Sequence, residues 1–282
     1  MNFINTQSIY RTSTEKVRGA FGNNIDEATR YYRRYVRFVV KHLSVRPARI
    51  LDVGGGNGWS TYLFRKEGHE AIGTDLPPGP VEAKAADEAL PYVSADVQQL
   101  PFDDAEFDAV AMHAVLEHVP DPERALREAL RVLRTGGRLM VVGPHLLSVG
   151  LSLRFALIET FKAISHGGRW QGRGPTTPVH PFGNTLPETY SHLAHHARQT
   201  IRKLAGERPV RFLLREPDCR PPFHGDNDAC YFCNPMDLIT WAKQKSGVKL
   251  IQWRATDRRS ARFLWPITGG TWNVMEKTRN GF

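Results

Sequence analysis

The residues best suited to chemistry lie in segment 49–59, which reads RILDVGGGNGW. The apolar run 50–53 predicts a buried strand, and the spaced glycines after it let the backbone turn sharply and approach a ligand. The dinucleotide fingerprint G-x-G-x-x-G is absent, because Trp59 stands where its third glycine would fall. Asp52 would repel a pyrophosphate but suits a cationic ligand, either by direct contact or by holding the turn. The segment therefore predicts a nucleotide-type cradle for a cationic ligand.

A second carboxylate closes the next predicted strand, 71–75. Asp75 stands 21 residues after Gly54. That separation puts its carboxylate where it can accept hydrogen bonds from two ribose hydroxyls. The pair of glycine turn and acid predicts that a nucleoside lies across the first two strands.

Three histidines are candidates for a general base. His113 and His118 follow the predicted strand 107–112, and His145 follows the predicted strand 138–142. Histidine titrates near neutral pH, so it can deprotonate a hydroxyl during attack. We rank His145 first, because it opens a long segment that we expect to face the second substrate.

Predicted strands and helices alternate over segment 48–145, at the spacing of a parallel doubly wound sheet that would position these residues. Helices are predicted at 60–66 and from Asp121-Pro122 to a stop at Gly136-Gly137. Before this segment, Asp26 is predicted to cap a helix that reaches about Leu43. Its apolar stripe, which we expect to pack in the core against the sheet, is rich in aromatic residues: Ala28, Tyr31, Tyr32, Tyr35, Val36, Phe38, Val39 and Leu43.

The glycine turn, Asp75, the run SADV at 94–97 and the block 107–142 resemble, in the same order, the motifs of class I S-adenosylmethionine (SAM) methyltransferases of the methyltransferase-11-like type. The resemblance covers about 95 residues. It implies an α/β fold, namely a doubly wound, Rossmann-like seven-stranded sheet, with SAM as the cofactor and S-adenosylhomocysteine as its product.

The resemblance also implies roles for single residues. Asp96 would accept a hydrogen bond from the adenine amino group, with apolar neighbours packed on the ring. The expected cofactor-binding set is Asp52, Gly54, Gly56, Gly58, Asp75, Leu76, Asp96, Val97 and His113.

The order of the predicted elements departs from the family pattern after the fifth strand, where we expect a mostly helical insertion before the closing helix and the last two strands. A segment this long inside a domain is normally functional. The expected parts are an N-terminal helical cap at 1–47, the SAM-binding core at 48–145, a substrate lid at 146–234 and the closing elements at 235–282. We expect His145, His224 and Asp226 to line the substrate site, although the polar run 224–228 would also suit a turn and a cap.

The cysteines raise the question of a metal. Cys219, His224, Cys230 and Cys233 could supply ligands for tetrahedral zinc, but their spacing matches no finger or ribbon. We therefore expect no metal, and reduced thiols instead.

The composition is that of an ordinary globular protein, with 41% hydrophobic and 24% charged residues. No secretory signal or membrane span is evident, so we expect a cytoplasmic protein. The net charge of +9 favours anionic partners or simply reflects a generally basic protein.

The reaction expected first is methyl transfer to a hydroxyl of a secondary metabolite or sugar. Three alternatives stay open: a lipid-linked acceptor reached by an insertion lying against the membrane, a nucleic-acid target, and a SAM-binding scaffold without turnover. The chain lacks an N-P-P-Y-like tetrapeptide after the fourth strand, which speaks against the nucleic-acid target. The oligomeric state is not indicated by the sequence.

Overall fold

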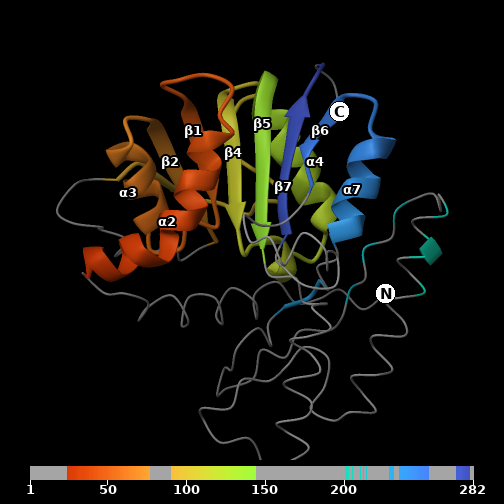
Figure 1. Cartoon of the computed structure of the whole chain (residues 1–282), viewed down its shortest axis with the longest axis horizontal. Helices are drawn as coiled ribbons and strands as arrows, with labels where there is room; N and C mark the ends of the chain where they lie inside the picture. The colour runs from red at the N-terminus through yellow and green to blue at the C-terminus, as the bar shows by residue number, and fades with distance from the viewer. Residues whose placement is uncertain are drawn as a thin grey trace, which may run out of the picture.

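The computed structural model describes residues 24–76, 90–143, 235–253 and 271–279, together with isolated positions between 198 and 231. Seven strands form one sheet in the order β3-β2-β1-β4-β5-β7-β6 (Figure 1). The strands are β1 (Arg49–Val53), β2 (Glu70–Asp75), β3 (Tyr92–Ser94), β4 (Phe107–His113), β5 (Leu133–Gly143), β6 (Val248–Gln252) and β7 (Thr271–Lys277). The first five run parallel, and β7 is antiparallel to both β5 and β6. The predicted seven-stranded, doubly wound sheet is confirmed.

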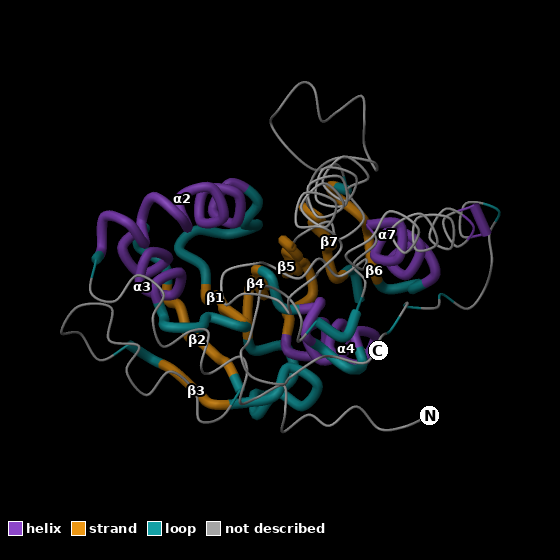
Figure 2. The backbone as a smooth tube through the Cα atoms, turned by 90° about the horizontal axis from the view of Figure 1, so that it is seen from below, coloured by secondary structure: helices purple, strands orange, loops and turns teal. Residues whose placement is uncertain are grey.

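From β1 the chain continues to β2 and β3 on one side, and then crosses to β4 on the other side of β1. The carboxyl ends of β1 and β4 therefore form a topological switch point at one edge of the sheet. In doubly wound sheets, ligands bind in the crevice outside the carboxyl ends of the strands at this point. Figure 2 looks toward that edge and shows α2 (Ile25–Lys41) and α3 (Trp59–Lys66) on one face of the sheet, with α4 (Pro122–Val132) on the other.

Each face of the sheet has its own apolar core. Toward α2 and α3, the strand residues Ile50, Ala111 and Met140 pack with Tyr35, Val39 and Phe64. Toward α4 and α7 (Pro235–Gln244), the core includes Leu51, Met112, Val141, Leu126, Trp241 and Met275. Alternate strand residues thus serve opposite faces, as the two-residue period of a strand requires.

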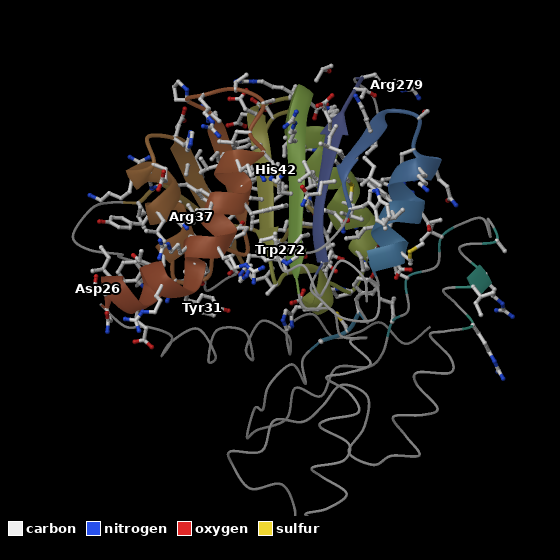
Figure 3. The ribbon with its side chains drawn as sticks, in the orientation of Figure 1. Asp26, Tyr31, Arg37, His42, Trp272 and Arg279 are labelled. Atoms are coloured by element: carbon white, nitrogen blue, oxygen red, sulfur yellow. The ribbon has the colours of Figure 1, made fainter. Side chains whose placement is uncertain are left out.

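Helix α2 begins at a different cap from the one predicted. The side chain of Asn24 accepts a hydrogen bond from the Glu27 amide at 3.0 Å, so Asn24 is the N-cap and Asp26 lies in the first turn. The predicted stripe buries Tyr35, but Tyr31 is 56% exposed, so assigning Tyr31 to the core was wrong. Figure 3 shows Tyr31 near the end of α2 that lies toward the carboxyl edge of the sheet.

The step from α4 to β5 also differs from the prediction. Asp121 caps α4, with Pro122 at the first helical position, as predicted. The helix ends at Val132, and β5 begins at Leu133, so Gly136-Gly137 lie inside the strand and do not stop the helix. The buried ammonium of Lys277 donates to the carbonyl of Leu133 at 2.6 Å, which ties β7 to this junction.

The predicted closing helix and final strands are present as α7, β6 and β7. Most of the predicted insertion 146–234, and of the segment 1–47 before α2, lies outside the described residues, so the division into parts remains a proposal. In the described portion of the chain, no helix is long and apolar enough to cross a membrane.

Candidate functional site

The glycine turn after β1 is fixed to the neighbouring strand. The amides of Gly54 and Gly55 donate to the carbonyl of Thr74 at 2.7 and 3.1 Å. Gly54, Gly56 and Gly58 have φ angles of +69°, +53° and +82°, in the left-handed region that favours glycine. The alternating pattern of the sequence therefore marks the three positions where the chain needs this conformation.

Gly54 is constrained by packing as well as by its backbone angle. A Cβ atom added there would lie 2.2 Å from Cγ2 of Val115, on the loop after β4. The turn and the β4 loop thus approach closely at the switch point of the sheet, which no larger residue at position 54 would permit.

Asp52 holds the turn from below. Its carboxylate is 1% exposed and accepts hydrogen bonds from the hydroxyls of Ser60 at 2.6 Å, Thr61 at 2.8 Å and Tyr35 at 3.1 Å. Burial raises the pKa of the Asp52 carboxyl to about 6, against the lowering effect of these donors. Of the two roles considered for Asp52, holding the turn fits this arrangement better than direct contact with a ligand, because the carboxylate already has three donors.

Asp75, the predicted ribose partner, ends β2 beside the glycine turn. Its Oδ2 accepts from the Gly56 amide at 2.9 Å and its Oδ1 from the Leu76 amide at 2.7 Å. A carboxylate has about four acceptor positions, so two remain for a diol. Burial raises the pKa of Asp75, while the two amides and the nearby His118 lower it.

Two tyrosines surround the same carboxylates. The Tyr92 hydroxyl donates to the carbonyl of Gly56 at 3.1 Å. Burial, and then the proximity of Asp75 and Asp52, raise the pKa of Tyr92 far above its usual range. Burial also raises the pKa of Tyr32, to which Tyr31, Asp52 and Asp75 add. Both tyrosines therefore remain neutral hydrogen-bonding groups at pH 7.

The residues after β3 form a tight turn. Asp96 accepts from the backbone amide of Gln98 at 2.8 Å, and both its carboxylate oxygens accept from the Gln98 side chain. Val97 is 6% exposed and packs in the core, so its side chain supports the turn from inside. Leu76 is half-buried at the end of β2. The roles of Asp96, Val97 and Leu76 toward adenine remain proposals.

His113 ends β4 within an aromatic group from α2. Its ring lies 4.7 Å from that of Tyr35, 5.8 Å from Tyr32 and 6.0 Å from Tyr31, measured between centroids. Burial lowers the pKa of His113 to about 4. The imidazole is therefore neutral at pH 7 and a weak proton acceptor, which suits a wall of the site better than a base.

The two residues after Leu116 face different parts of the site. His118 lies near enough to Asp75 to lower the pKa of that carboxyl. Glu117 is buried, and its carbonyl accepts from the amides of Cys230 and Tyr231 at 2.7 and 3.0 Å. The short 3₁₀ turn η1 (Leu116–His118) thus lies between Asp75 and residues 230–231, which precede α7.

The predicted substrate residues His145, His224 and Asp226 lie outside the described residues, as do Cys219 and Cys233. Within the described segments, no group of three or more His, Cys, Asp or Glu side chains could hold a metal ion. Cys230 is a buried cysteine in the thiol form.

Sequence reasoning missed the hydroxyl donors around Asp52. Ser60 and Thr61 follow the glycine turn in the first turn of α3, and an acid followed by adjacent hydroxyls could have signalled the network. Tyr35 comes from a helix 17 residues earlier, so no local pattern could have paired it with Asp52.

The assembled residues suit a nucleoside that carries a positive charge. The glycine turn has no Cβ atoms to hold a ligand away from its backbone, Asp75 keeps acceptor capacity for a diol, and the neighbouring carboxylates create a negative potential. A pyrophosphate at this site would be repelled by the Asp75 carboxylate. This arrangement of backbone and carboxylates therefore fits SAM.

Comparison with known proteins agrees with this fit. A family model described as a methyltransferase domain matches residues 51–141. A demethylmenaquinone methyltransferase of Clavibacter sepedonicus is 38% identical over 97 residues, which cover 33% of this chain and 40% of the relative. The enzyme of that name from Mycolicibacterium paratuberculosis is 39% identical over 113 residues, covering 40% of this chain and 47% of the relative. The chain thus spans less than half the length of these two relatives.

Solved structures give weaker likenesses. A SAM-dependent methyltransferase from Mesorhizobium loti is 16% identical, with 87% of this chain and 97% of that chain covered and a TM-score of 0.48. The 1,6-didemethyltoxoflavin-N1-methyltransferase from Burkholderia thailandensis is 26% identical, with 50% and 64% covered and a TM-score of 0.41. The sheet order, the glycine turn and the matched segment lead to one conclusion: the chain carries a methyltransferase domain of the class I SAM-dependent family.

Proposed function

We propose that this protein transfers a methyl group from SAM to a small-molecule acceptor, with a hydroxyl of a secondary metabolite or sugar as the first choice. The observation that carries the proposal is the pairing of Asp75 with the glycine turn through the Gly56 amide. This bond orients the carboxylate beside exposed backbone, where a ribose diol can reach it.

Bound SAM supplies a methyl group already activated by the sulfonium charge. The protein therefore mainly has to hold donor and acceptor in line, and orientation alone can supply up to about 7–11 kcal/mol. Asp52 fixes the turn, Asp75 takes the ribose, and His113 with Tyr35 forms a wall that limits access of water.

A base is needed only if the acceptor is a hydroxyl or an acidic carbon. The low pKa of His113 makes this histidine a weak candidate for the base. We retain His145 as the first candidate and His118 as the second, and we place the acceptor beside the segment that follows β5.

The cofactor assignment is tested by calorimetry with S-adenosylhomocysteine. Asp75→Ala should weaken binding at least tenfold, because hydrogen bonds to a charged acceptor contribute about 1.5–3 kcal/mol each. Asp26→Ala removes an exposed carboxylate on α2 and should leave binding unchanged. Equal affinity of the wild type and Asp75→Ala would refute the cofactor site.

Turnover is tested with labelled SAM and a panel of phenols, sugars and naphthoquinols. Methylation of any of these supports a small-molecule acceptor. Tight cofactor binding without methylation of any acceptor class would favour the scaffold alternative.

A lipid-linked acceptor is the second candidate. The relatives named as demethylmenaquinone methyltransferases act, by their name, on a quinone, and this likeness supports the variant. Flotation with neutral and anionic liposomes tests peripheral membrane contact, and failure to float with either would remove this alternative. Elution from heparin that does not depend on salt would likewise remove the nucleic-acid alternative.

A further inference from the structure

The strand β7 carries buried polar groups on the face of the sheet that packs against α4 and α7. Thr271 is 3% exposed and Asn273 is fully buried. Among the residues that the structure describes, the Thr271 hydroxyl and both polar atoms of the Asn273 amide have no hydrogen-bond partner. Such groups are rare in folded proteins, and leaving each one unsatisfied costs about 1–3 kcal/mol.

Register places these two side chains together. Thr271 pairs with Gly143 and Asn273 with Val141 on β5. Residues two apart on a strand share a face, so both side chains lie on the face where Val141 packs in the core. Figure 3 shows Trp272, the residue between them, in the part of β7 toward which β4 and β5 run.

A carboxyl group lies beside this pair. Oε2 of Glu117 lies 3.6 Å from the position that a Cβ atom at Gly143 would occupy. Cβ positions of directly paired residues lie about 4.5–5.5 Å apart on one face of the sheet. The Glu117 carboxyl therefore lies on the same face as the Thr271 hydroxyl, at the carboxyl edge. We call Glu117, Thr271 and Asn273 the β7 polar cluster.

The β7 polar cluster adjoins the cofactor site through η1. His118, the next residue after Glu117, lies near Asp75, and Val115 covers Gly54. A methyl acceptor must reach this same edge, because doubly wound sheets bind their ligands there. The cluster is thus placed where the second substrate has to enter.

We propose that the β7 polar cluster holds a hydroxyl group of the methyl acceptor. The carboxyl of Glu117 accepts a hydrogen bond from that hydroxyl, and the Asn273 amide donates one to its oxygen, while the Thr271 hydroxyl can do either. This inference rests on the proposed function and extends it, because it selects hydroxyl-bearing acceptors over purely apolar ones.

The test compares 1-naphthol with naphthalene as probes of the protein loaded with S-adenosylhomocysteine. The two probes share a ring system and differ only in the hydroxyl. In the wild type, 1-naphthol should bind about tenfold more tightly, and it should shift the side-chain amide signal of Asn273 in nitrogen-15 spectra. Asn273→Leu, which removes the amide, assigns that signal.

The variants Thr271→Val, Asn273→Leu and Glu117→Gln should each reduce the preference for 1-naphthol at least threefold. Thr271→Ser keeps the hydroxyl and should keep the preference. Thr240→Val makes the same change at a buried threonine of α7 that is not a member of the cluster, and it should have no effect. Affinity for S-adenosylhomocysteine should be unchanged throughout.

An unmoved Asn273 signal, or a preference that survives in all three variants, would overturn the inference. The cofactor measurement separates the two proposals. If the wild type does not bind S-adenosylhomocysteine, the proposed function fails, and 1-naphthol binding to the protein alone then decides whether the cluster takes a hydroxyl.

Discussion

At the scale of single residues, the site depends on one buried carboxylate and one glycine. Asp52 accepts hydrogen bonds from three hydroxyl donors, and burial keeps its pKa at about 6. Gly54 combines a positive φ with contact to Val115. Both residues shape the turn without needing to touch the ligand, so their variants separate the integrity of the turn from direct binding.

Asp52→Asn should change how stability depends on pH. The folded pKa of Asp52 exceeds its unfolded value near 4, so its contribution to stability is largest below pH 4 and is lost as the pH rises through 6. The free energy of unfolding of the wild type minus that of Asp52→Asn should fall by about 3 kcal/mol between pH 4 and pH 7. Urea titrations across this range measure it.

The comparison with Asp52→Asn is needed because the titration of His113 changes the pH dependence of stability in the opposite direction. Its folded pKa is lowered to about 4, so its contribution to stability is lost as the pH falls through the same range. That effect is present in both proteins and cancels in the difference. A difference that stays constant with pH would contradict the environment assigned to Asp52.

Gly54→Ala should lose cofactor binding and destabilise the fold, whereas Gly68→Ala should only destabilise it. Both positions have positive φ, which costs an alanine about 1–2 kcal/mol. Only at Gly54 would the new Cβ meet another atom, since nothing lies within 4 Å at Gly68. Urea unfolding and calorimetry with S-adenosylhomocysteine measure both effects. Retention of full affinity in Gly54→Ala would show that the turn tolerates displacement.

At the scale of elements, the sequence predicted the helices and strands that local residue patterns determine. The strand β1, the capped start of α4 and the final strands follow from apolar runs, an Asp-Pro pair and spacing. The end of α4 did not follow, because Gly136-Gly137 resemble a helix stop. Instead, Leu133 pairs with Phe107 on β4, so the chain joins the sheet before it reaches the two glycines.

Long-range contacts account for the rest of what was missed at this scale. The bond from Tyr35 to Asp52 joins α2 to β1, and Lys277 on β7 reaches the end of α4. Neither contact leaves a periodic signal in the sequence. Glycine and acid motifs therefore indicated the proposed cofactor site, while the β7 polar cluster emerged only from the strand register.

Lys277→Met should loosen the junction of α4, β5 and β7. The ammonium is 3% exposed and donates to the carbonyls of Leu133 and Arg131 at the end of α4. The Arg131 carbonyl keeps the Ala105 amide as a donor, but the buried Leu133 carbonyl loses the ammonium, which should cost about 1–3 kcal/mol in the free energy of unfolding. Lys243→Met, on the exposed side of α7, serves as the control and should change it by less than about 0.5 kcal/mol. Equal stability of the two variants would exclude this role for Lys277.

At the scale of the whole molecule, helices lie on both faces of a sheet whose carboxyl edge holds the proposed site (Figures 1 and 2). The glycine turn, Asp75 and the η1 turn all lie at that edge. The turn between α7 and β6 lies at the opposite edge of the sheet, where Val248 at the start of β6 pairs with Lys277 at the end of β7. Ligand binding should therefore affect the two edges differently.

Hydrogen exchange provides this comparison. S-adenosylhomocysteine should slow exchange of the amides at 54–59 and 75–76, because the ligand contacts and orders that edge. Amides at 245–248 should exchange at an unchanged rate. Uniform slowing at both edges would instead indicate global stabilisation without a local site.

The position of β7 has a consequence for how the protein is assembled. This strand is made after β6 yet lies between β6 and β5, so β6 has no place in the sheet until residues 271–277 have emerged. Thr271 and Asn273 arrive with that strand. A nascent chain can thus shape its nucleoside cradle early, while the groups proposed to receive the second substrate are completed only with the closing strand.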